Sequence, residues 1–375
     1  MHPLPHPPAP QRLAQIALAR QAVLQDGAPP AQHLAPWLSR SWQRCLTRGQ
    51  MPQRKLSFEA VNAPGVAHAL ERNQPLLSAA RPVIASLAQA VADTRYFTLL
   101  TDAQGVVIDI NGPVDRHDSR ATALARLGVD LSEQAVGTTA IGATLAELQP
   151  VWLHRGEHFF DDTAVYSCAG APVFGPDGLC AGMLDLTGIE VPERPALRHL
   201  VTQSARRIEN ALVQARSHEL LLRLAWPGHG VGSEADGLLA VDGNGTVVGF
   251  NPAAADMLAL QPGWSAPHLD QLFATATGPL FDRARTGPAA VELPLWSGLR
   301  LQVLVAQPGQ ASRWQAHTGP ASTAGAGGDV PLKDVEASLI RRAIDTHRGN
   351  VAAAAKALGI SRATVYRKLG KPNPK

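Results

Sequence analysis

Several residue types are scarce in this 375-residue sequence, and each scarcity excludes a class of protein. Charged residues make up 17% of the chain and hydrophobic residues 45%, which excludes a highly charged disordered polypeptide. Three cysteines, an odd number without the spacing of metal ligands, exclude a disulfide scaffold and favour a reducing cytoplasm. No run of about 18 apolar residues is present, so we expect no membrane span. The Pro-rich start lacks the basic and apolar stretches of a signal peptide.

The charge that is present is distributed unevenly. Residues 1–92 hold 9 Lys and Arg against 3 Asp and Glu, whereas residues 93–330 hold 15 against 25. Residues 331–375 hold 10 against 3, so the net charges of the three segments are +6, −10 and +7. A short basic end on an acidic body predicts a polyanion-binding module attached to a different kind of domain.

Length and local pattern predict a multidomain α+β protein. Apolar residues recur with helical spacing at the start, and we assign 1–79 to an N-terminal helical region. Strand-like runs separated by turn residues, such as Gln104-Gly105 and Asp177-Gly178, predict a sensor-sized domain over 80–192. A long helix is expected over 195–224, within a connecting segment that we place at 193–226.

A second, smaller domain is predicted over 234–306. The run GLLAVDGNGTVVGF indicates a strand, a turn and a strand, and Asn251-Pro252 then opens a helix with Asn as its cap. Further strands are expected at 290–295 and 299–305. Residues 307–330 are rich in Gly, Ala, Ser and Thr without periodicity and predict a flexible linker.

The last segment, 331–375, predicts an all-α helix-turn-helix. The short helices VAAAAKAL and RATVYRKL, capped by Asn350 and Ser361, are joined by a tight Gly-containing turn. In such motifs the second helix reaches base edges in the major groove, and Arg pairs bidentately with guanine. The alternative is a surface helical hairpin with a solvated basic face. The predicted DNA-binding residues around the second helix are Ser361, Arg362, Thr364, Tyr366, Arg367, Lys368 and Lys371.

The stretch AIDTHRGNVAAAAKALGISRATVYRKL resembles the Fis-type helix-turn-helix that ends many bacterial enhancer-binding regulators. The resemblance places DNA contacts at Arg362, Thr364 and Arg367, and it adds Asn350 as a phosphate contact. It also implies that the chain binds double-stranded DNA as a homodimer.

Three upstream motifs resemble the sensor half of acetoin-catabolism-type regulators, which is a GAF domain. They are SRSWQRCLTRG, EQAVGTTAIGATLAELQPVWLHRGEHF and CAGAPVFGPDGLCAGMLDLTG. Residues 234–306 resemble a short PAS domain, with FNPAAADML as the most typical part. The resemblance implies a small-molecule effector pocket in the GAF-like domain. The sequence contains no haem or flavin signature, so we expect no cofactor. The candidate lining residues are Trp152, His154, His158, Tyr166 and Cys168, although core packing explains Trp152 and Tyr166 equally well.

The sequence departs from that family in one respect. Its members carry a central AAA+ ATPase, whereas this sequence contains no G-x-x-x-x-G-K-[ST] phosphate loop and no GAFTGA-like segment. We therefore expect a cytoplasmic transcriptional regulator without ATPase activity that binds a palindromic site. It would act through ordinary RNA polymerase, by occlusion of a site, or by competition with a related regulator.

Two further motifs invite enzymatic interpretations. His154-Arg-Gly-Glu157-His158 matches the zinc-peptidase signature H-x-x-E-H, but it follows a strand-like run and contains Gly156, so we predict no metal site. Cys168 and Cys180 lie five or six residues out of register across the expected hairpin, so they should not form a disulfide. A cysteine-dependent GAF-fold redox enzyme, and an antagonist partner of a full-length enhancer-binding regulator, remain the alternatives.

Overall fold

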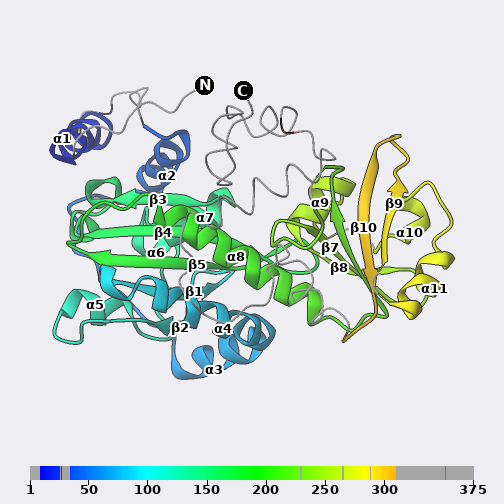
Figure 1. The fold of residues 1–375 in the computed structure, drawn as a ribbon. Helices are drawn as coiled ribbons and strands as arrows, with labels where there is room; N and C mark the ends of the chain where they lie inside the picture. Colours follow the sequence, from blue (N-terminus) through cyan, green and yellow to red (C-terminus); the bar gives the residue numbers. More distant parts are fainter. Residues whose placement is uncertain are drawn as a thin grey trace, which may run out of the picture. The chain divides into compact units, whose positions relative to one another are not determined.

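The computed structural model describes residues 9–25, 27, 34–228, 230–263, 266–287, 289–309 and 351 (Figure 1). The chain divides into two compact units, Met1–Thr318 and Gly319–Lys375. The described part of the first unit contains two five-stranded antiparallel sheets with helices, which confirms the expected mixed architecture. No helix in the described ranges is both long and hydrophobic enough to cross a bilayer. Almost all of the predicted linker and helix-turn-helix lie outside the described residues.

The first sheet has the strand order β2-β1-β5-β4-β3. Both predicted turns are confirmed, and Gly105 and Gly178 adopt the positive φ that such turns require. The central strands β1 and β5 are almost entirely buried because helices cover both faces of the sheet. The five strands are β1 (Tyr96–Asp102), β2 (Val107–Asn111), β3 (Val151–His154), β4 (Tyr166–Phe174) and β5 (Cys180–Ile189).

Two long helices cover one face of this sheet and form one hydrophobic cluster with it. The apolar stripe of α4, which includes Leu77, Ile84 and Leu87, is buried there, so α4 belongs to the sheet domain and the boundary expected at residue 79 falls inside a helix. The elements on or next to this face are α3 (Ala63–Arg72), α4 (Gln74–Ala90), η2 (Ala92–Thr94) and α8 (Leu197–Gln214).

The other face carries short helices and turns around a second hydrophobic cluster. Gly142 allows α6 and α7 to approach very closely, because a Cβ at this position would lie 2.8 Å from the backbone of Glu133. The elements are α1 (Ala9–Arg20), η1 (Gln21–Gln25), α2 (Pro36–Thr47), α5 (Ser119–Leu124), α6 (Glu133–Val136), α7 (Ala140–Glu147), η3 (Arg155–Glu157) and η4 (Asp161–Thr163).

The second sheet has the strand order β8-β7-β6-β10-β9 and its own hydrophobic cluster. The predicted helix start is confirmed, since the Asn251 side chain accepts a hydrogen bond from Ala254 N and Pro252 is the first helical residue. Strands also occupy the two predicted positions near residues 290 and 300. The elements are β6 (Leu220–Ala225), β7 (Gly237–Val241), β8 (Val247–Phe250), β9 (Ala289–Pro294), β10 (Arg300–Ala306), α9 (Pro252–Leu258), α10 (Leu269–Leu272) and α11 (Gly278–Thr286).

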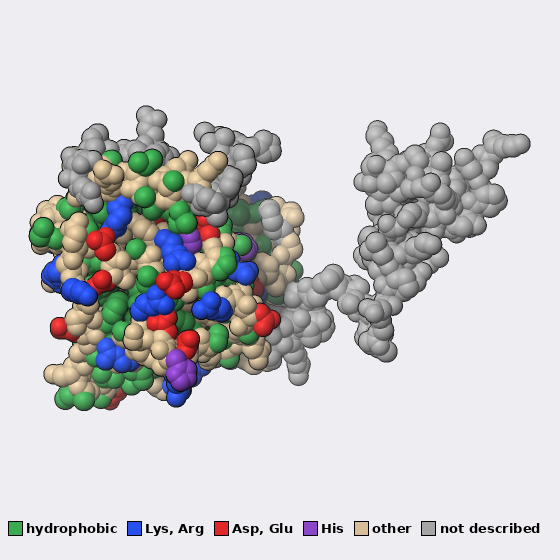
Figure 2. Space-filling model, turned by 90° about the vertical axis from the view of Figure 1, so that its left-hand side faces the viewer, with side chains coloured by type: hydrophobic (Ala, Val, Ile, Leu, Met, Phe, Trp, Pro, Cys, Tyr) green, Lys and Arg blue, Asp and Glu red, His purple; other side chains and the backbone are tan. Residues whose placement is uncertain are grey.

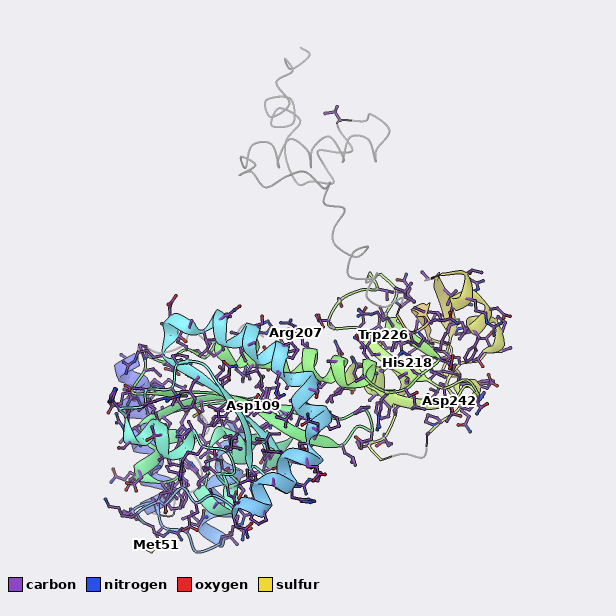
Figure 3. All side chains as sticks on the ribbon, turned by 90° about the horizontal axis from the view of Figure 1, so that it is seen from below. Met51, Asp109, Arg207, His218, Trp226 and Asp242 are labelled. Atoms are coloured by element: carbon purple, nitrogen blue, oxygen red, sulfur yellow. The ribbon has the colours of Figure 1, made fainter. Side chains whose placement is uncertain are left out.

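The helix expected over 195–224 was wrong in its second half. Helix α8 ends at Gln214, and residues 220–225 form β6, which pairs with both β7 and β10 in the middle of the second sheet. His218 and Trp226 bracket this strand (Figure 3). A leucine-rich run of six residues fits a helix or a fully buried strand equally well, and only its partners decide between them. The second domain therefore begins near Leu220, not at 234.

The contact between β1 and β5 provides a test of this fold. A Cβ built on Gly182 lies 2.1 Å from the carbonyl oxygen of Thr101, a backbone atom held in the sheet. We expect Gly182→Ala to lower the free energy of unfolding, measured in urea, by about 2 kcal/mol or more, because the strands must separate. Gly278→Ala is the control, since no atom lies within 4 Å of its Cβ position. Equal losses in both variants would contradict the β1–β5 register.

Candidate functional site

A small cavity lies between the first sheet and the short helices on its second face, and its volume is about 30 Å³. The sheet supplies one wall, and loops and short helices supply the others. The lining residues are Phe58, Leu99, Leu124, Leu131, Thr139, Ala140, Ile141, His158, Thr163, Tyr166, Cys168, Asp185 and Thr187.

A chain of hydrogen bonds crosses the sheet wall of the cavity. The Thr187 hydroxyl donates to Asp185 Oδ2 over 2.5 Å, and Cys168 Sγ lies 3.3 Å from that hydroxyl. In this second contact the thiol and the hydroxyl can each be the donor. Burial raises the pKa of Asp185 to about 7. Among the described residues, Asp185 Oδ1 has no hydrogen-bond partner.

His158 contributes a second unsatisfied polar atom. Its Nδ1 lies 2.9 Å from the carbonyl oxygen of Arg155, which only accepts, so Nδ1 carries the proton and Nε2 is an acceptor. Within the described part of the chain, no partner reaches this buried Nε2. Burial lowers the pKa of His158 to about 4, so the ring is neutral at pH 7. The ring meets the edge of Tyr166, with 6.4 Å between centroids.

This arrangement favours a small neutral molecule that forms hydrogen bonds. A buried polar atom without a partner costs free energy, so a ligand that satisfies both atoms gains stability that an apolar ligand does not. The volume is close to that of one or two water molecules, whereas a cavity of about 150 Å³ holds benzene. A ligand of several heavy atoms therefore requires the walls to move.

Three of the five residues expected to line a pocket do so, namely His158, Tyr166 and Cys168. Trp152 and His154 lie on the opposite face of the sheet, which corrects their expected placement. Trp152 belongs to the cluster under α4 and α8, and His154 Nδ1 lies 2.7 Å from the Ser167 hydroxyl. Side chains alternate along a strand, so residues 152 and 154 share a face that 151 and 153 do not.

Asp185 and Thr187 were not predicted from the sequence. Their signal was an isolated acid and a threonine, two residues apart, in the otherwise apolar run MLDLTG. Residues two apart on a strand point to the same face, so both reach the same cavity wall. An acidic residue in a buried strand needs a partner or a function. Asp185 has a partner, Thr187, on its Oδ2 alone.

The H-x-x-E-H segment does not form a helix. Strand β3 ends at His154 and the turn η3 follows, so the two histidines point to different faces of the sheet. Glu157 Oε2 accepts a hydrogen bond from His154 N over 2.7 Å. No group of three or more His, Cys, Asp or Glu in the described ranges is placed to hold a metal ion.

The expected offset of Cys168 and Cys180 is confirmed. Cys168 pairs with Thr187 across β4 and β5, whereas Cys180 pairs with Phe174, six positions further along β4. Both cysteines and Cys45 are free thiols. Burial raises the pKa of Cys168 well above 9 and that of Cys45 to about 11, so neither is activated as a thiolate.

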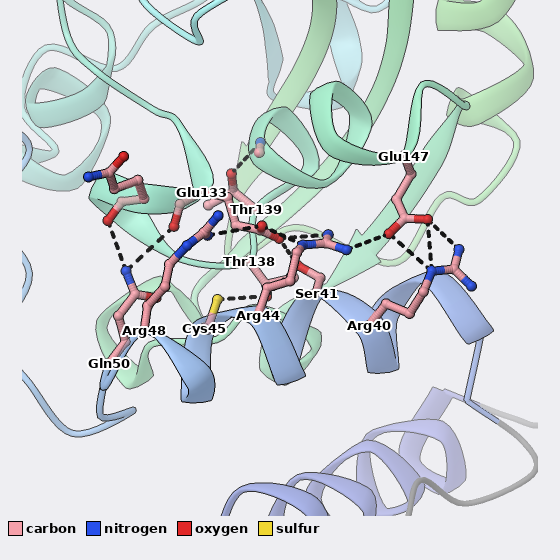
Figure 4. Close-up of polar contacts among 12 residues, drawn as sticks. Arg40, Ser41, Arg44, Cys45, Arg48, Gln50, Glu133, Thr138, Thr139 and Glu147 are labelled. Atoms are coloured by element: carbon pink, nitrogen blue, oxygen red, sulfur yellow. Dashed lines mark hydrogen bonds and ion pairs between the residues drawn. The ribbon is translucent and has the colours of Figure 1, made fainter.

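Arginines of α2 dock the helix on α6 and α7 beside the cavity (Figure 4). Arg44 binds Glu133 and Glu147, each with a shortest distance of 2.7 Å. Arg40 also binds Glu147, and Arg48 lies 3.2 Å from Glu133. The three arginines are spaced one helical turn apart, so one stripe of α2, continued by its C-cap residue Arg48, makes all of these ion pairs.

Helix α1 also forms ion pairs with the domain of the first sheet. Arg12 forms ion pairs with Glu157 at 2.8 Å and Glu193 at 2.6 Å. Arg20 binds Asp161 and the carbonyl oxygens of His158 and Phe159. The space-filling view shows basic and acidic side chains interspersed on the face that it draws (Figure 2). The basic N-terminal region thus pairs extensively with the acidic domain beside it.

Two protein-family models match this chain, one over residues 13–210 and one over residues 331–371. Residues 13–210 match the family described as "MimR, N-terminal domain", which is more than half of the sequence. The chain belongs to the MimR N-terminal-domain family. Residues 331–371 match "Bacterial regulatory protein, Fis family", which confirms the resemblance of the C-terminal segment.

Two curated relatives of this MimR-family chain are transcriptional regulators by name. It is 32% identical over 253 residues to the acetoin catabolism regulatory protein of Cupriavidus necator, covering 65% of this chain and 37% of the relative. It is 30% identical over 197 residues to the propane 2-monooxygenase operon transcriptional activator MimR of Mycolicibacterium goodii, covering 52% and 32%. The chain thus spans about a third of the length of these relatives.

One solved structure aligns with most of this family member. The DhaR(N)–DhaL complex of E. coli covers 73% of this chain and 100% of that chain, with 14% identity and a TM-score of 0.46. A likeness of this extent carries no functional assignment.

The buried carboxyl of Asp185 predicts a pH dependence. Its folded pKa of about 7 exceeds the ordinary 3.8, so the folded protein holds a proton that the unfolded chain releases. The associated stability is complete below about pH 4 and is lost as pH rises through about 7. Asp185→Asn, which is always neutral, should gain stability over the wild type across this window.

The gain should be a few kcal/mol by pH 8, since one pKa unit corresponds to about 1.4 kcal/mol. Urea unfolding of both proteins at several pH values measures this difference. The buried carboxyls of Glu157 and Glu209, whose pKa values burial also raises, are common to both proteins and cancel. A difference that does not change with pH would contradict the buried, protonated state of Asp185.

Proposed function

We propose that the chain is a cytoplasmic DNA-binding transcriptional regulator in which a small neutral effector binds the cavity of a GAF-like domain. The observation that carries the proposal is the presence, in one chain, of a MimR N-terminal domain and a Fis-family segment. In this proposal the chain acts without ATP hydrolysis, and the second sheet is a PAS-like domain that relays the signal or dimerises.

The DNA-binding half of the proposal rests on residues 331–375. A homodimer would place two recognition helices in successive major grooves, so the site is a palindrome with half-sites about one helical turn apart. The contacts are those expected from the sequence, with Arg362 and Thr364 reading bases and Arg367, Lys368 and Lys371 meeting phosphates. The net charge of +7 supplies the electrostatic attraction.

The sensing half rests on the two unsatisfied atoms in the cavity, Asp185 Oδ1 and His158 Nε2. A hydroxyl of the effector donates to His158 Nε2, and a second hydroxyl or a carbonyl pairs with Asp185. The carboxyl of Asp185 accepts when ionised and donates when protonated. Small diols and hydroxyketones fit this pattern, and one relative is named for acetoin catabolism.

A cysteine-dependent enzyme is the less favoured function. The nucleophile in such an enzyme is the thiolate, but burial raises the pKa of Cys168 and of Cys180. The Cys168 thiol instead takes part in the hydrogen-bond chain of the cavity wall. The other alternative is an antagonist that pairs with a full-length relative, and it would use the same DNA-binding segment. This alternative is supported if deletion of such a relative abolishes the regulation.

DNA binding is tested by selecting bound sequences from a random pool and then comparing two variants. Arg362→Ala should weaken binding by about 1–3 kcal/mol at one base position and relax the preference there. Arg367→Ala should weaken binding to all sequences and reduce the slope of log affinity against log salt by about 1. Failure of the wild type to bind any selected sequence with salt-dependent affinity would overturn the proposal.

Effector binding is tested by thermal unfolding with a panel of small diols, hydroxyketones and ketones that includes acetoin. A ligand that binds only the folded state should raise the Tm by several degrees at about 100 times its Kd. Thr187→Val breaks the hydrogen-bond chain at Asp185 and should remove the shift. Thr144→Val is the matched control, because this buried hydroxyl lies outside the cavity and makes no bond in the described structure. A shift that survives Thr187→Val would place the ligand elsewhere.

A further inference from the structure

We propose that α2 is a strap that responds to occupation of the cavity: an occupant that widens the cavity displaces the α6–α7 corner and loosens α2. The proposal rests on the proposed function, because it concerns regulation through the candidate effector site. It requires that the cavity widens on one side, that the widened wall moves as a unit, and that this wall holds α2.

When the cavity widens, the wall formed by short helices moves and the sheet wall does not. The sheet wall consists of residues on β1, β4 and β5, which are the three inner strands of the sheet and are backed by the cluster under α4 and α8. The facing wall includes Leu124 of α5 and residues 139–141 at the start of α7. Helices α5 and α7 have only 6 and 8 residues, so they shift more easily than a central strand.

The α6–α7 corner moves as one body because its two helices touch at backbone distance. A Cβ on Gly142 would approach within 2.8 Å of the Glu133 backbone, so there is no space for one helix to move toward the other. The Thr139 hydroxyl, at the cavity wall, also accepts a hydrogen bond from Gly142 N over 3.1 Å. Displacement of the start of α7 therefore carries Glu133 with it.

Helix α2 is attached to this same corner (Figure 4). Ser41 Oγ binds Glu133 and lies 2.7 Å from the Thr138 hydroxyl. Cys45 Sγ lies 3.5 Å from the same hydroxyl, and Arg44 binds Glu133 through two nitrogens. Thr138 is the residue immediately before the cavity wall, so the contacts of α2 begin one residue from the cavity.

A second attachment of α2 reaches η3 and the residue that follows it. Trp42, which is fully buried, donates a hydrogen bond from Nε1 to the carbonyl oxygen of Glu157 over 2.9 Å. The next residue is His158, which lines the cavity. Phe159 N in turn donates a hydrogen bond to the carbonyl oxygen of Thr138 over 3.2 Å, so this segment is bonded to the α6–α7 corner. Helix α2 therefore holds both the corner and the segment attached to it, and an occupant that displaces the corner strains both attachments.

Cys45 is a native reporter of the strap, because its thiol is fully buried against Thr138. Ala140→Leu adds three carbons at the cavity wall and imitates an occupant. We expect the alkylation rate of Cys45, resolved from Cys168 and Cys180 by mass spectrometry, to rise about tenfold while that of Cys180 stays unchanged. Ala171→Leu, on the opposite face of the sheet, is the matched control.

The proposal is overturned if Ala140→Leu leaves Cys45 protected, or if Ala171→Leu exposes Cys45 equally. Global unfolding would raise the rates of all three thiols and is thereby recognised. Should Ala140→Leu not fold, coupling is tested in the reverse direction, since coupling between two sites is reciprocal. Arg44→Gln should then increase alkylation of Cys168 in the cavity several-fold. Arg72→Gln, which loses an ion pair with Asp102 away from the cavity, should not.

An unchanged Cys168 rate in Arg44→Gln would also reject the strap. Neither alkylation experiment uses a ligand. A negative result in them is therefore distinct from the absence of a Tm shift with the panel of small molecules. Protection of Cys45 in Ala140→Leu, together with a Tm shift from the panel, would leave the effector site standing without the strap.

Discussion

The carboxylate of Glu133 is the group on which the arrangement around the cavity depends. It is buried at the start of α6, and a buried charge is costly unless ion pairs and hydrogen bonds compensate it. Arg44, Arg48 and Ser41 supply both kinds of contact; Ser41 and Arg44 lie on α2, and Arg48 is its C-cap residue. The position of α2 is therefore coupled to that of the α6–α7 corner, since separating them would leave a buried charge without partners.

The same requirement explains the uneven charge of the sequence. An N-terminal segment of net charge +6 beside an acidic body could contact phosphates or the body itself, and the structure shows arginines of α1 and α2 in ion pairs with the body. Charge counts reveal the imbalance but not its partners, because the pairing residues are far apart in sequence. Arg44 and Glu133, for example, are separated by 89 residues.

Features with local causes were predictable from the sequence, and features set by distant partners were not. The turns at Gly105 and Gly178 and the capped helix at Asn251 follow from short-range chemistry, and all three predictions are confirmed. Strand β6 was mistaken for helix because its leucines satisfy either structure until β7 and β10 flank them. For the cavity, the sequence indicated the right strands, but only pairing fixes which alternate residues face inward, so Trp152 was included and Asp185 was missed.

The size and the chemistry of the cavity together constrain how it discriminates among ligands. An unpaired buried polar atom costs about 1–3 kcal/mol, so a ligand that pairs both Asp185 and His158 recovers up to a few kcal/mol. Widening a cavity of about 30 Å³ opposes binding, and this cost is similar for an apolar molecule of the same shape. Only the ligand with matching hydrogen-bonding groups offsets it. Selectivity thus arises because every ligand must widen the cavity, and only hydrogen bonds to the polar groups of the walls offset the free energy that this widening costs.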